Sequence, residues 1–527
     1  MSVRRAVVFS GQGAQRKGMG MDLINLSTAP LWENMKNTMK QNYGVNIQEI
    51  VQDNPTKVQM FEDASSLKYI NSFPCSATLN ENGLDKTKTT VSHKDGVLTL
   101  TYFTQPCTLA AQLLALEHYK SQKGELENVA AFAGHSLGEF TALTALEVFS
   151  PETAANLTFR RGMLMETTLD LFDRTKHRLY ACNPLRAKLH SDPATCDDMF
   201  FVLVELIARA LAHTTSFLEV ANYNVVFEQY VAAGDPVALA VLGKCLDPQF
   251  RANSSCSSLG ELVKEAISSV GVDNADGITQ FPNDIKIKDF VTSSFRKYGH
   301  RATFRRFLRG PDDGFTPALS ELTQLTLQED GRSGLKRKSW FIPLPIEIPF
   351  HTSKLRRAAD LFYPIVKEAL PDEAELREKL SIGKDGKLID AKQPVWITNL
   401  TGRTFEPFSE NFQQDAREIM NSLNIGEISH NGRYTSTEIV DHFEQGIKLN
   451  SARDICASVL AAQMAHPVQW TDIMNEIVLK KDIANIVEFS PSRNASEMFR
   501  RTNFAKEEIP NSIISLTVSS YPTDSNI

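Results

Sequence analysis

The 527-residue sequence lacks any run of about 18 consecutive apolar residues, which excludes a membrane-spanning helix of the usual kind. Its N-terminal apolar segment is too short for the core of a secretory signal peptide. The seven cysteines are scattered and none forms a C-x-x-C pair, so we expect neither a metal site nor a disulfide framework. The net charge is -7 without a basic stripe, which argues against nucleic acid as a main partner. We therefore expect a reduced intracellular protein in the cytoplasm or, alternatively, in mitochondria.

The order of apolar and helical patterns predicts the fold class. Residues 1–165 alternate buried strands with amphipathic helices, which is typical of α/β architecture. Residues 172–245 read as strand, helix, strand, strand and helix, an order that suits a ferredoxin-like unit. We predict an α/β-hydrolase-like core with a parallel sheet and an inserted ferredoxin-like subdomain. A hairpin around Asp95-Gly96 is also expected.

Five segments follow from this order. The large subdomain would comprise residues 1–171, with the nucleophile, and 339–510, with the base; residues 172–246 would form the small subdomain, 247–338 a partly irregular insertion, and 511–527 a C-terminal tail. The insertion contains basic residues that could dock an acidic carrier or coenzyme A. A solvated surface insertion is the alternative that we favour.

The most informative stretch is Gly134-His135-Ser136-Leu137-Gly138. It is a Gly-x-Ser-x-Gly sequence that follows an apolar strand, Val129–Ala133, and precedes a helical pattern. A strand, a sharp turn and a helix are the context that a nucleophilic serine needs. The helix N-terminus also favours developing negative charge. An ordinary glycine-rich turn is the alternative.

A serine hydroxyl is a poor nucleophile at pH 7 and needs a base. His351 is the best candidate among eleven histidines, because it lies between an apolar strand pattern and a helical run. Such a junction can face the same sheet edge as Ser136. A capping or surface histidine is the alternative. His135 is adjacent to Ser136 but should point elsewhere in a sharp turn, with a role in packing or in a supporting hydrogen bond.

Arg161 is a charged residue on the inward face of a predicted helix. The helix begins at Ser150-Pro151, and Leu157 and Leu164 lie on the same face as Arg161. A guanidinium that faces the core needs an anionic partner. That partner could be a structural Asp or Glu, or a substrate carboxylate that arginine binds bidentately.

A second glycine-rich loop, Gly11-Gln12-Gly13, follows the first strand. It matches neither a dinucleotide-binding fingerprint nor a P-loop. Its backbone could approach the nucleophile, so that the N–H groups of Gln12 and Leu137 form an oxyanion hole. A plain turn is the alternative.

In combination these motifs resemble a known family, the malonyl-CoA:acyl carrier protein transacylases. The motifs that carry the resemblance are, in order, Gly11-Gln-Gly-Ala-Gln15, Thr104-Gln-Pro106, Gly134-His-Ser-Leu-Gly-Glu139, Arg161-Gly162-Met163, Pro349-Phe-His351 and His466-Pro-Val-Gln-Trp470. Asn222-Tyr-Asn224 and Asn399-Leu-Thr-Gly402 make the chain most similar to the malonyl/palmitoyl transferase domain of the fungal-type fatty acid synthase β subunit. Ser490-Pro491-Ser492 departs from the usual glycine-rich turn.

The resemblance implies a role for each matching residue. Ser136 would carry the acyl group, His351 would act as base and then as acid, and Arg161 would pair with the malonate carboxylate. Gln463 would help to orient His351 in place of the acid of a Ser-His-Asp triad. Phe350 resembles the residue of malonyl-selective members.

The predicted activity is transfer of a malonyl group from malonyl-CoA, through an ester on Ser136, to the phosphopantetheine thiol of an acyl carrier protein in fatty acid biosynthesis. Long-chain acyl groups could also be transferred. No cofactor and no metal are expected, and we expect a monomer. A serine hydrolase and a non-enzymatic scaffold are the alternatives. Against a hydrolase, the sequence has no evident catalytic Asp between Ser136 and His351. Against a scaffold, such a protein would need none of Ser136, His351 and Arg161.

Overall fold

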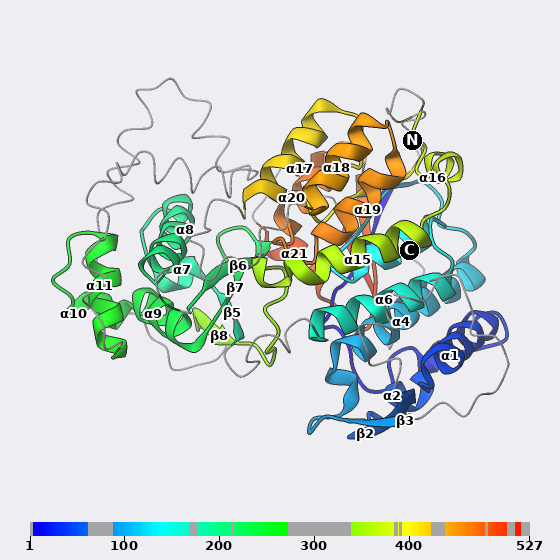
Figure 1. Ribbon diagram of the computed structural model, residues 1–527, viewed down its shortest axis with the longest axis horizontal. Coiled ribbons are helices and arrows are strands. Elements are labelled where there is room, and N and C mark those ends of the chain that lie inside the picture. The colour runs from blue at the N-terminus through cyan, green and yellow to red at the C-terminus, as the bar shows by residue number, and fades with distance from the viewer. Residues whose placement is uncertain are drawn as a thin grey trace.

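The computed structural model of the chain describes residues 4–61, 88–167, 177–211, 214, 216–271, 339–383, 388, 393–422, 438–479, 483–502 and 512–517. They form a larger α/β part and a smaller part built on a second sheet (Figure 1). From residue 272 to 338 the predicted insertion lies outside the described residues.

The larger part is built on a five-stranded parallel sheet, as predicted. The strand order is β11-β10-β1-β4-β9. The strands are β1 (Arg4–Phe9), β4 (Val129–Gly134), β9 (Val395–Ile397), β10 (Ile483–Ser490) and β11 (Ser512–Thr517). The predicted tail from residue 511 is corrected, because β11 pairs with β10 along its whole length. Its Ile-Ile-Ser-Leu sequence is short but suits an edge strand.

Helices cover both faces of this sheet. Side chains alternate along β1, with Val7 and Phe9 in one hydrophobic cluster and Ala6 and Val8 in another. On the first face lie α1 (Ala29–Tyr43), α2 (Ile47–Asp53), α4 (Thr101–Lys123), α5 (Gly138–Ala145), α6 (Pro151–Thr167), α15 (Arg356–Ala369), α16 (Glu373–Lys379), α17 (Glu410–Ser422), α18 (Glu438–Lys448) and α19 (Ala452–Ala462). The second face is covered by α20 (Trp470–Leu479) and α21 (Ala495–Arg501).

The smaller part has the strand order of a ferredoxin-like fold, as predicted. Its antiparallel sheet runs β6-β7-β5-β8. The elements are β5 (Arg178–Cys182), α7 (Pro184–Ala187), α8 (Pro193–Ala210), β6 (Leu218–Val225), β7 (Gln229–Gly234), α9 (Pro236–Leu246), α10 (Pro248–Asn253), α11 (Leu259–Val270) and β8 (Phe341–Pro343).

The predicted end of this unit at residue 246 is too early. Leu262 and Val263 of α11 are buried in the same hydrophobic cluster as α8 and α9, and Phe341 of β8 packs against that cluster. The fourth strand thus comes from beyond the insertion. Its three residues are too few for an alternating apolar and polar pattern to indicate a strand.

The predicted hairpin around Asp95-Gly96 is wrong. β3 (Lys88–Ser92) pairs with β2 (Lys57–Phe61) instead of with a strand after Gly96. Val97 and Leu98 are buried in a short 3-10 turn, so the segment after Gly96 enters the core rather than extending as a strand.

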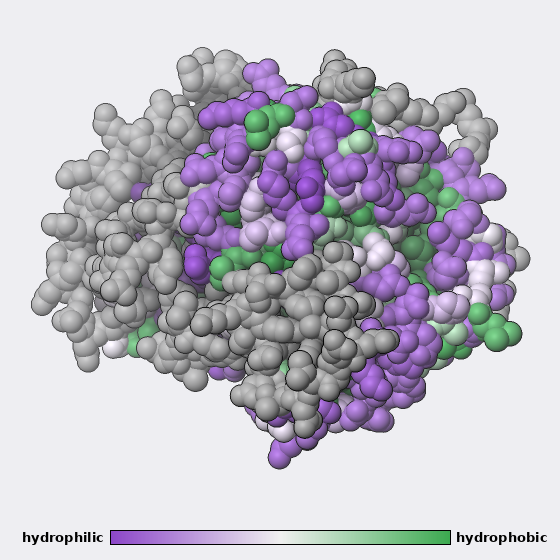
Figure 2. Space-filling view, turned by 45° about the vertical axis from the view of Figure 1, so that its right-hand side comes forward, coloured by the Kyte–Doolittle hydropathy of each residue, from purple (hydrophilic) through white to green (hydrophobic). Residues whose placement is uncertain are grey.

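The described surface is mainly hydrophilic. On the face shown in Figure 2, hydrophobic residues form small groups among hydrophilic ones. Within the described ranges, the exposed large hydrophobic side chains are Leu26, Leu185 and Leu449. No helix among these residues is long and apolar enough to cross a membrane.

Candidate active site

The nucleophile turn joins β4 to α5 and has the geometry expected of a sharp elbow. Ser136 has a backbone φ of 52°, a left-handed conformation that serine rarely adopts. A Cβ at Gly134 would lie 1.9 Å from the carbonyl of Gly138, and one at Gly138 would lie 2.4 Å from the oxygen of Phe9. Only glycine fits at both positions, which explains the Gly-x-Ser-x-Gly sequence physically.

His351 lies in hydrogen-bonding contact with Ser136, although 215 positions separate them. The distance from Ser136 Oγ to His351 Nε2 is 2.8 Å, and both residues are buried. His351 Nδ1 lies 2.7 Å from the main-chain oxygen of Gln463. Because a carbonyl can only accept, Nδ1 carries the proton and Nε2 is free to accept one from the serine. The pair therefore has the arrangement of a nucleophile with its general base.

The environment keeps His351 in its basic, neutral form. Burial, which has the larger effect, and the positive charge of Arg161 together lower the pKa of His351 to about 3. The hydrogen bond to the carbonyl of Gln463 acts in the opposite direction. At neutral pH the imidazole is thus unprotonated and able to receive the serine proton.

Arg161 lies beside the nucleophile and contacts neutral acceptors. Its guanidinium donates to Gln105 Oε1 at 2.9 Å, to Gln463 Oε1 at 2.9 Å and to Ser136 Oγ at 3.2 Å. Over the described ranges it forms no ion pair with a carboxylate, and its Nε atom has no acceptor. A buried guanidinium with neutral partners is a site that an anion would stabilise.

Glu139 is the acidic residue whose charge acts on Arg161, and its charge raises the pKa of that guanidinium. Burial lowers the pKa of Arg161 to about 9 and raises the pKa of Glu139 to about 8. Glu139 accepts a hydrogen bond from the main-chain N–H of Asn399 at 2.7 Å. With a pKa of about 8, Glu139 is mostly protonated at neutral pH, so it offsets little of the charge of Arg161 and occupies none of its donors.

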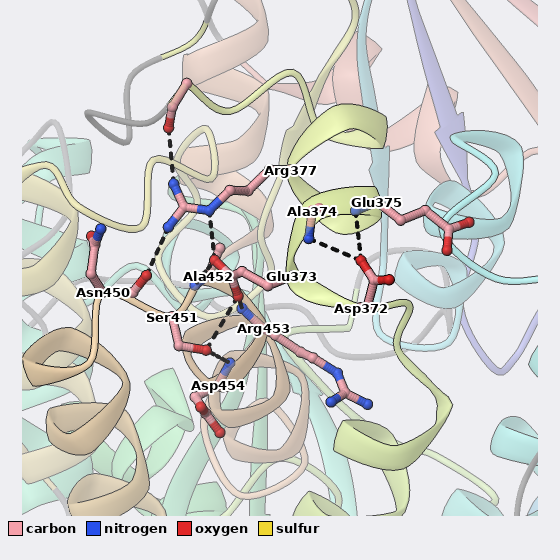
Figure 3. Close-up of polar contacts among 11 residues, drawn as sticks. Asp372, Glu373, Ala374, Glu375, Arg377, Asn450, Ser451, Ala452, Arg453 and Asp454 are labelled. Carbon is pink, nitrogen blue, oxygen red and sulfur yellow. Dashed lines mark hydrogen bonds and ion pairs between the residues drawn. The ribbon is translucent and has the colours of Figure 1, made fainter.

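Gln463 serves both the base and the arginine from the C-terminal end of α19. Its main-chain oxygen accepts from His351, its side-chain oxygen accepts from Arg161, and its side-chain Nε2 has no acceptor among the described residues. The other end of α19 is held by Glu373 of α16, whose carboxylate accepts from the N–H groups of Ala452 and Arg453 (Figure 3). A carboxylate at this end also complements the helix dipole.

Asn399, in the loop after β9, holds the nucleophile turn in place. Its Oδ1 accepts the main-chain N–H of Ser136 at 2.7 Å, and its Nδ2 donates to the main-chain oxygen of Gly134. Asn399 is completely buried. Local sequence gives it no role, and only its place in a motif shared with a family could have pointed to it.

The structure brings the predicted oxyanion loop against the nucleophile turn. A Cβ at Gly11 would lie 2.7 Å from the main-chain oxygen of His135, so the two turns touch. Gln112 of α4 donates to the main-chain oxygen of Ser10 at 2.7 Å and accepts from Thr141 of α5 at 2.6 Å. This bridge links the two turns from behind. That the N–H groups of Gln12 and Leu137 bind one oxyanion stays a prediction.

The other predicted site residues lie nearby. The ring of Phe350 lies 6.5 Å from that of His351, between centroids. His135 points away from the nucleophile, with its Nε2 atom 3.0 Å from Oδ1 of Asn224 in β6. Ser490, where a glycine-rich turn was expected, hydrogen-bonds through its hydroxyl to that of Ser10. Across the described ranges no His, Cys, Asp and Glu cluster could hold a metal ion.

The profile of the acyl transferase domain matches residues 6–259, which include the nucleophile turn and Arg161. This stretch of the chain is therefore similar to acyl transferase domains. The family resemblance predicted from the sequence motifs is thereby confirmed; the matched range contains Ser136 and Arg161, whereas His351 lies beyond it.

The curated relatives are larger proteins. The fatty acid synthase subunit beta of Schizosaccharomyces pombe is 29% identical over 450 residues, which cover 81% of this chain and 19% of the relative. The corresponding subunit of Saccharomyces cerevisiae is 29% identical over 447 residues, covering 80% and 18%. The chain therefore spans about a fifth of the length of these relatives.

A solved structure shares the fold. The acyl-carrier-protein S-malonyltransferase of Bartonella henselae superposes with a TM-score of 0.50 at 16% identity, covering 98% of this chain and 96% of that one. At this identity the likeness concerns the fold, which agrees with a parallel α/β core.

Proposed function

We propose that this acyl transferase moves a malonyl group from malonyl-CoA to the phosphopantetheine thiol of an acyl carrier protein during fatty acid biosynthesis. The observation that carries the proposal is the position of Arg161, a buried guanidinium 3.2 Å from the nucleophile hydroxyl with neutral acceptors around it. An acyl group that ends in a carboxylate would meet this guanidinium once it is attached to Ser136.

The first half of the reaction acylates the serine. Ser136 Oγ attacks the thioester carbonyl, and its proton passes to His351 Nε2 along the 2.8 Å hydrogen bond. The tetrahedral oxyanion would be held by the N–H groups of Gln12 and Leu137. When the C–S bond breaks, coenzyme A leaves as a thiol with the proton from His351, and the malonyl ester of Ser136 remains.

The second half uses the same atoms in the reverse direction. The carrier thiol gives its proton to His351 and attacks the ester carbonyl, and Ser136 regains a proton as the C–O bond breaks. Ser136 and His351 are both more than nine-tenths buried, so water is largely excluded and hydrolysis of the ester is limited.

The proposal also covers the cofactor requirement, the partner, the oligomeric state, the compartment and the range of acyl groups. The reaction needs no cofactor, because nucleophile, base and carboxylate ligand all come from this chain. The proposed partner is an acyl carrier protein, and we expect this chain to act as a monomer. The scattered cysteines support the cytoplasm as its compartment, with mitochondria as the alternative. Long-chain acyl transfer is a further activity that the likeness to fungal β subunits allows.

Incubation with malonyl-CoA in the absence of a carrier tests the proposal. Intact mass is measured beside a Ser136→Ala control. A malonyl-sized adduct on the parent protein alone is expected. Release of coenzyme A without an adduct would indicate a hydrolase, and neither adduct nor release would overturn the proposal.

A further inference from the structure

One strand of the small subdomain, β6, contacts the three segments that carry Ser136, His351 and Gln463. Near its end, Asn224 bonds to His135, next to the nucleophile. In its middle, Val468 donates to the oxygen of Ala221 at 3.0 Å, five residues after Gln463. Near its start, Glu219 binds Ser353, two residues after His351. A single strand of the small subdomain thus contacts the active site of the large subdomain at three points.

The contact between Glu219 and Ser353 is the charged one of the three. The main-chain N–H of Ser353 donates to Glu219 Oε2 at 2.9 Å, and the Ser353 hydroxyl donates to Glu219 Oε1. Hydrogen bonds to an ionised acceptor are stronger than neutral ones. The amine of Lys354 also lies over the ring of Phe217, 5.0 Å from its centroid. Two successive residues after the base are therefore attached to the small subdomain.

His351 needs such support because its backbone is strained. Its φ is 60°, a conformation that costs a non-glycine residue about 1–3 kcal/mol and persists only when neighbours enforce it. On one side, the His351 N–H donates to the oxygen of Met464 at 3.1 Å. On the other side, the two hydrogen bonds that Glu219 makes with Ser353 cross to the small subdomain, beside the contact of Lys354 with Phe217.

We propose that Glu219 is a positioning residue, which holds the His351 loop from the small subdomain and so sets the hydrogen bond between His351 and Ser136. The inference rests on the proposed function only in that both require Ser136 to react with His351 as its base. It follows that the reactivity of the serine depends on how the two subdomains are attached to each other, and a displacement of about 1 Å at the base can cost about 100-fold in rate.

Three substitutions test the contact. Glu219→Ala removes both hydrogen bonds, and Ser353→Ala removes only the one made by the hydroxyl. Glu219→Gln can keep both, since an amide oxygen accepts the N–H and an amide nitrogen can donate to the hydroxyl. Glu228→Ala is the matched control, because Glu228 lies in the turn between β6 and β7 and its 3.2 Å ion pair with Arg501 of α21 also joins the two parts, away from His351 in the sequence.

The readout is the rate at which a fluorophosphonate labels Ser136, which needs the serine and its base but no malonyl group. In this reaction the serine oxygen forms a bond to phosphorus, fluoride leaves and the serine proton passes to His351. We expect Glu219→Ala to slow labelling by about 10- to 100-fold. Ser353→Ala should slow it less, and Glu219→Gln and Glu228→Ala should stay within threefold of the parent.

The His351→Ala background separates positioning from a general structural effect. If Glu219 acts through His351, then Glu219→Ala should cause little further loss in a protein that already lacks the base. An equal fold-loss in both backgrounds, or parent-like labelling of Glu219→Ala, would overturn the inference. Because labelling needs no malonyl-CoA, a failure of the proposed malonyl transfer would be seen separately in the adduct experiment.

Discussion

His351 takes its orientation from the main-chain oxygen of Gln463, 2.7 Å from Nδ1, whereas the side chain of Gln463 is bonded to Arg161. A main-chain acceptor is present whatever the side chain. Substitution of Gln463 therefore acts on the arginine and leaves the partner of the base in place, so two functions of one residue can be measured apart.

Gln463→Glu should abolish the preference for malonyl groups. The new carboxylate would lie on Arg161 and form an ion pair with the donors that malonate would use. We expect malonyl transfer to fall by at least about 100-fold, since a competing buried pair is worth several kcal/mol. Acetyl transfer should change by less than tenfold. Steady-state kinetics with both thioesters measure the ratio, with Gln463→Ala as the control that adds no charge.

Arg161→Ala should lose malonyl transfer and keep or gain transfer of uncharged acyl groups. Removal of one partner of a buried pair costs about 3–5 kcal/mol, which is more than 100-fold in selectivity. Arg161→Lys should be intermediate, because it retains a charge but not the planar fork. Competition between malonyl-CoA and acetyl-CoA, followed by mass, measures it. An unchanged malonyl preference in Arg161→Ala would contradict the assigned role.

Acylation of Ser136 should remain fast well below the ordinary pKa of histidine. Because the pKa of His351 is lowered to about 3, the base stays unprotonated at pH 5, and the acid limb of kcat/KM should lie below pH 4. Rapid-quench measurements after a brief pH jump avoid acid unfolding. A limb centred near pH 6.5 would show that the imidazole is not desolvated.

The same shift affects stability, with a sign that follows from proton binding. Between the ordinary pKa and about 3, unfolded His351 binds a proton and folded His351 does not, so stability falls as the pH drops below 6.5. His351→Gln should therefore lose less stability than the parent between pH 6.5 and 4. Denaturant unfolding at each pH supplies the comparison.

Asn399→Ala should lower the rate of acylation, because Asn399 holds the turn that carries Ser136. The substitution leaves the buried N–H of Ser136 without its acceptor, which costs about 1–3 kcal/mol, and it frees a strained turn. We expect kcat/KM to fall by about 100-fold. Asn42→Ala is the matched control, since it removes a buried amide bond to Asn156, 2.8 Å long, between α1 and α6. It should lower the melting temperature with little effect on acylation.

Local patterns sufficed for the parts of the site that lie within one element. The glycines around Ser136 and the inward face of Arg161 follow from steric and periodic rules that act over a few residues. The prediction for His351 depended in addition on an assumption about which edge of the sheet the residue faces. Asn399 could not be found this way, because its contact with Ser136 depends on β9 lying next to β4, and strand order is a property of the whole chain.

The fold, like the site, was predicted correctly where the pattern within one element is clear. Strands with clear apolar patterns, such as β1 and β4, lie where expected. The three-residue β8 and the edge strand β11 were missed, because short or edge strands carry weak patterns and their pairing is decided by distant partners.

The position of β1 has a consequence for how the chain is made. This strand is synthesised before β4 and β10, yet in the finished sheet it lies between them, and the hydroxyl contact between Ser10 and Ser490 joins residues 480 positions apart. The central strand must wait for β10, which is synthesised several hundred residues later, so the core of the sheet cannot close before then. Pairings of such long range fold slowly and leave strand edges open. Newly made chains should thus depend on chaperones, while the small subdomain can assemble most of its sheet earlier.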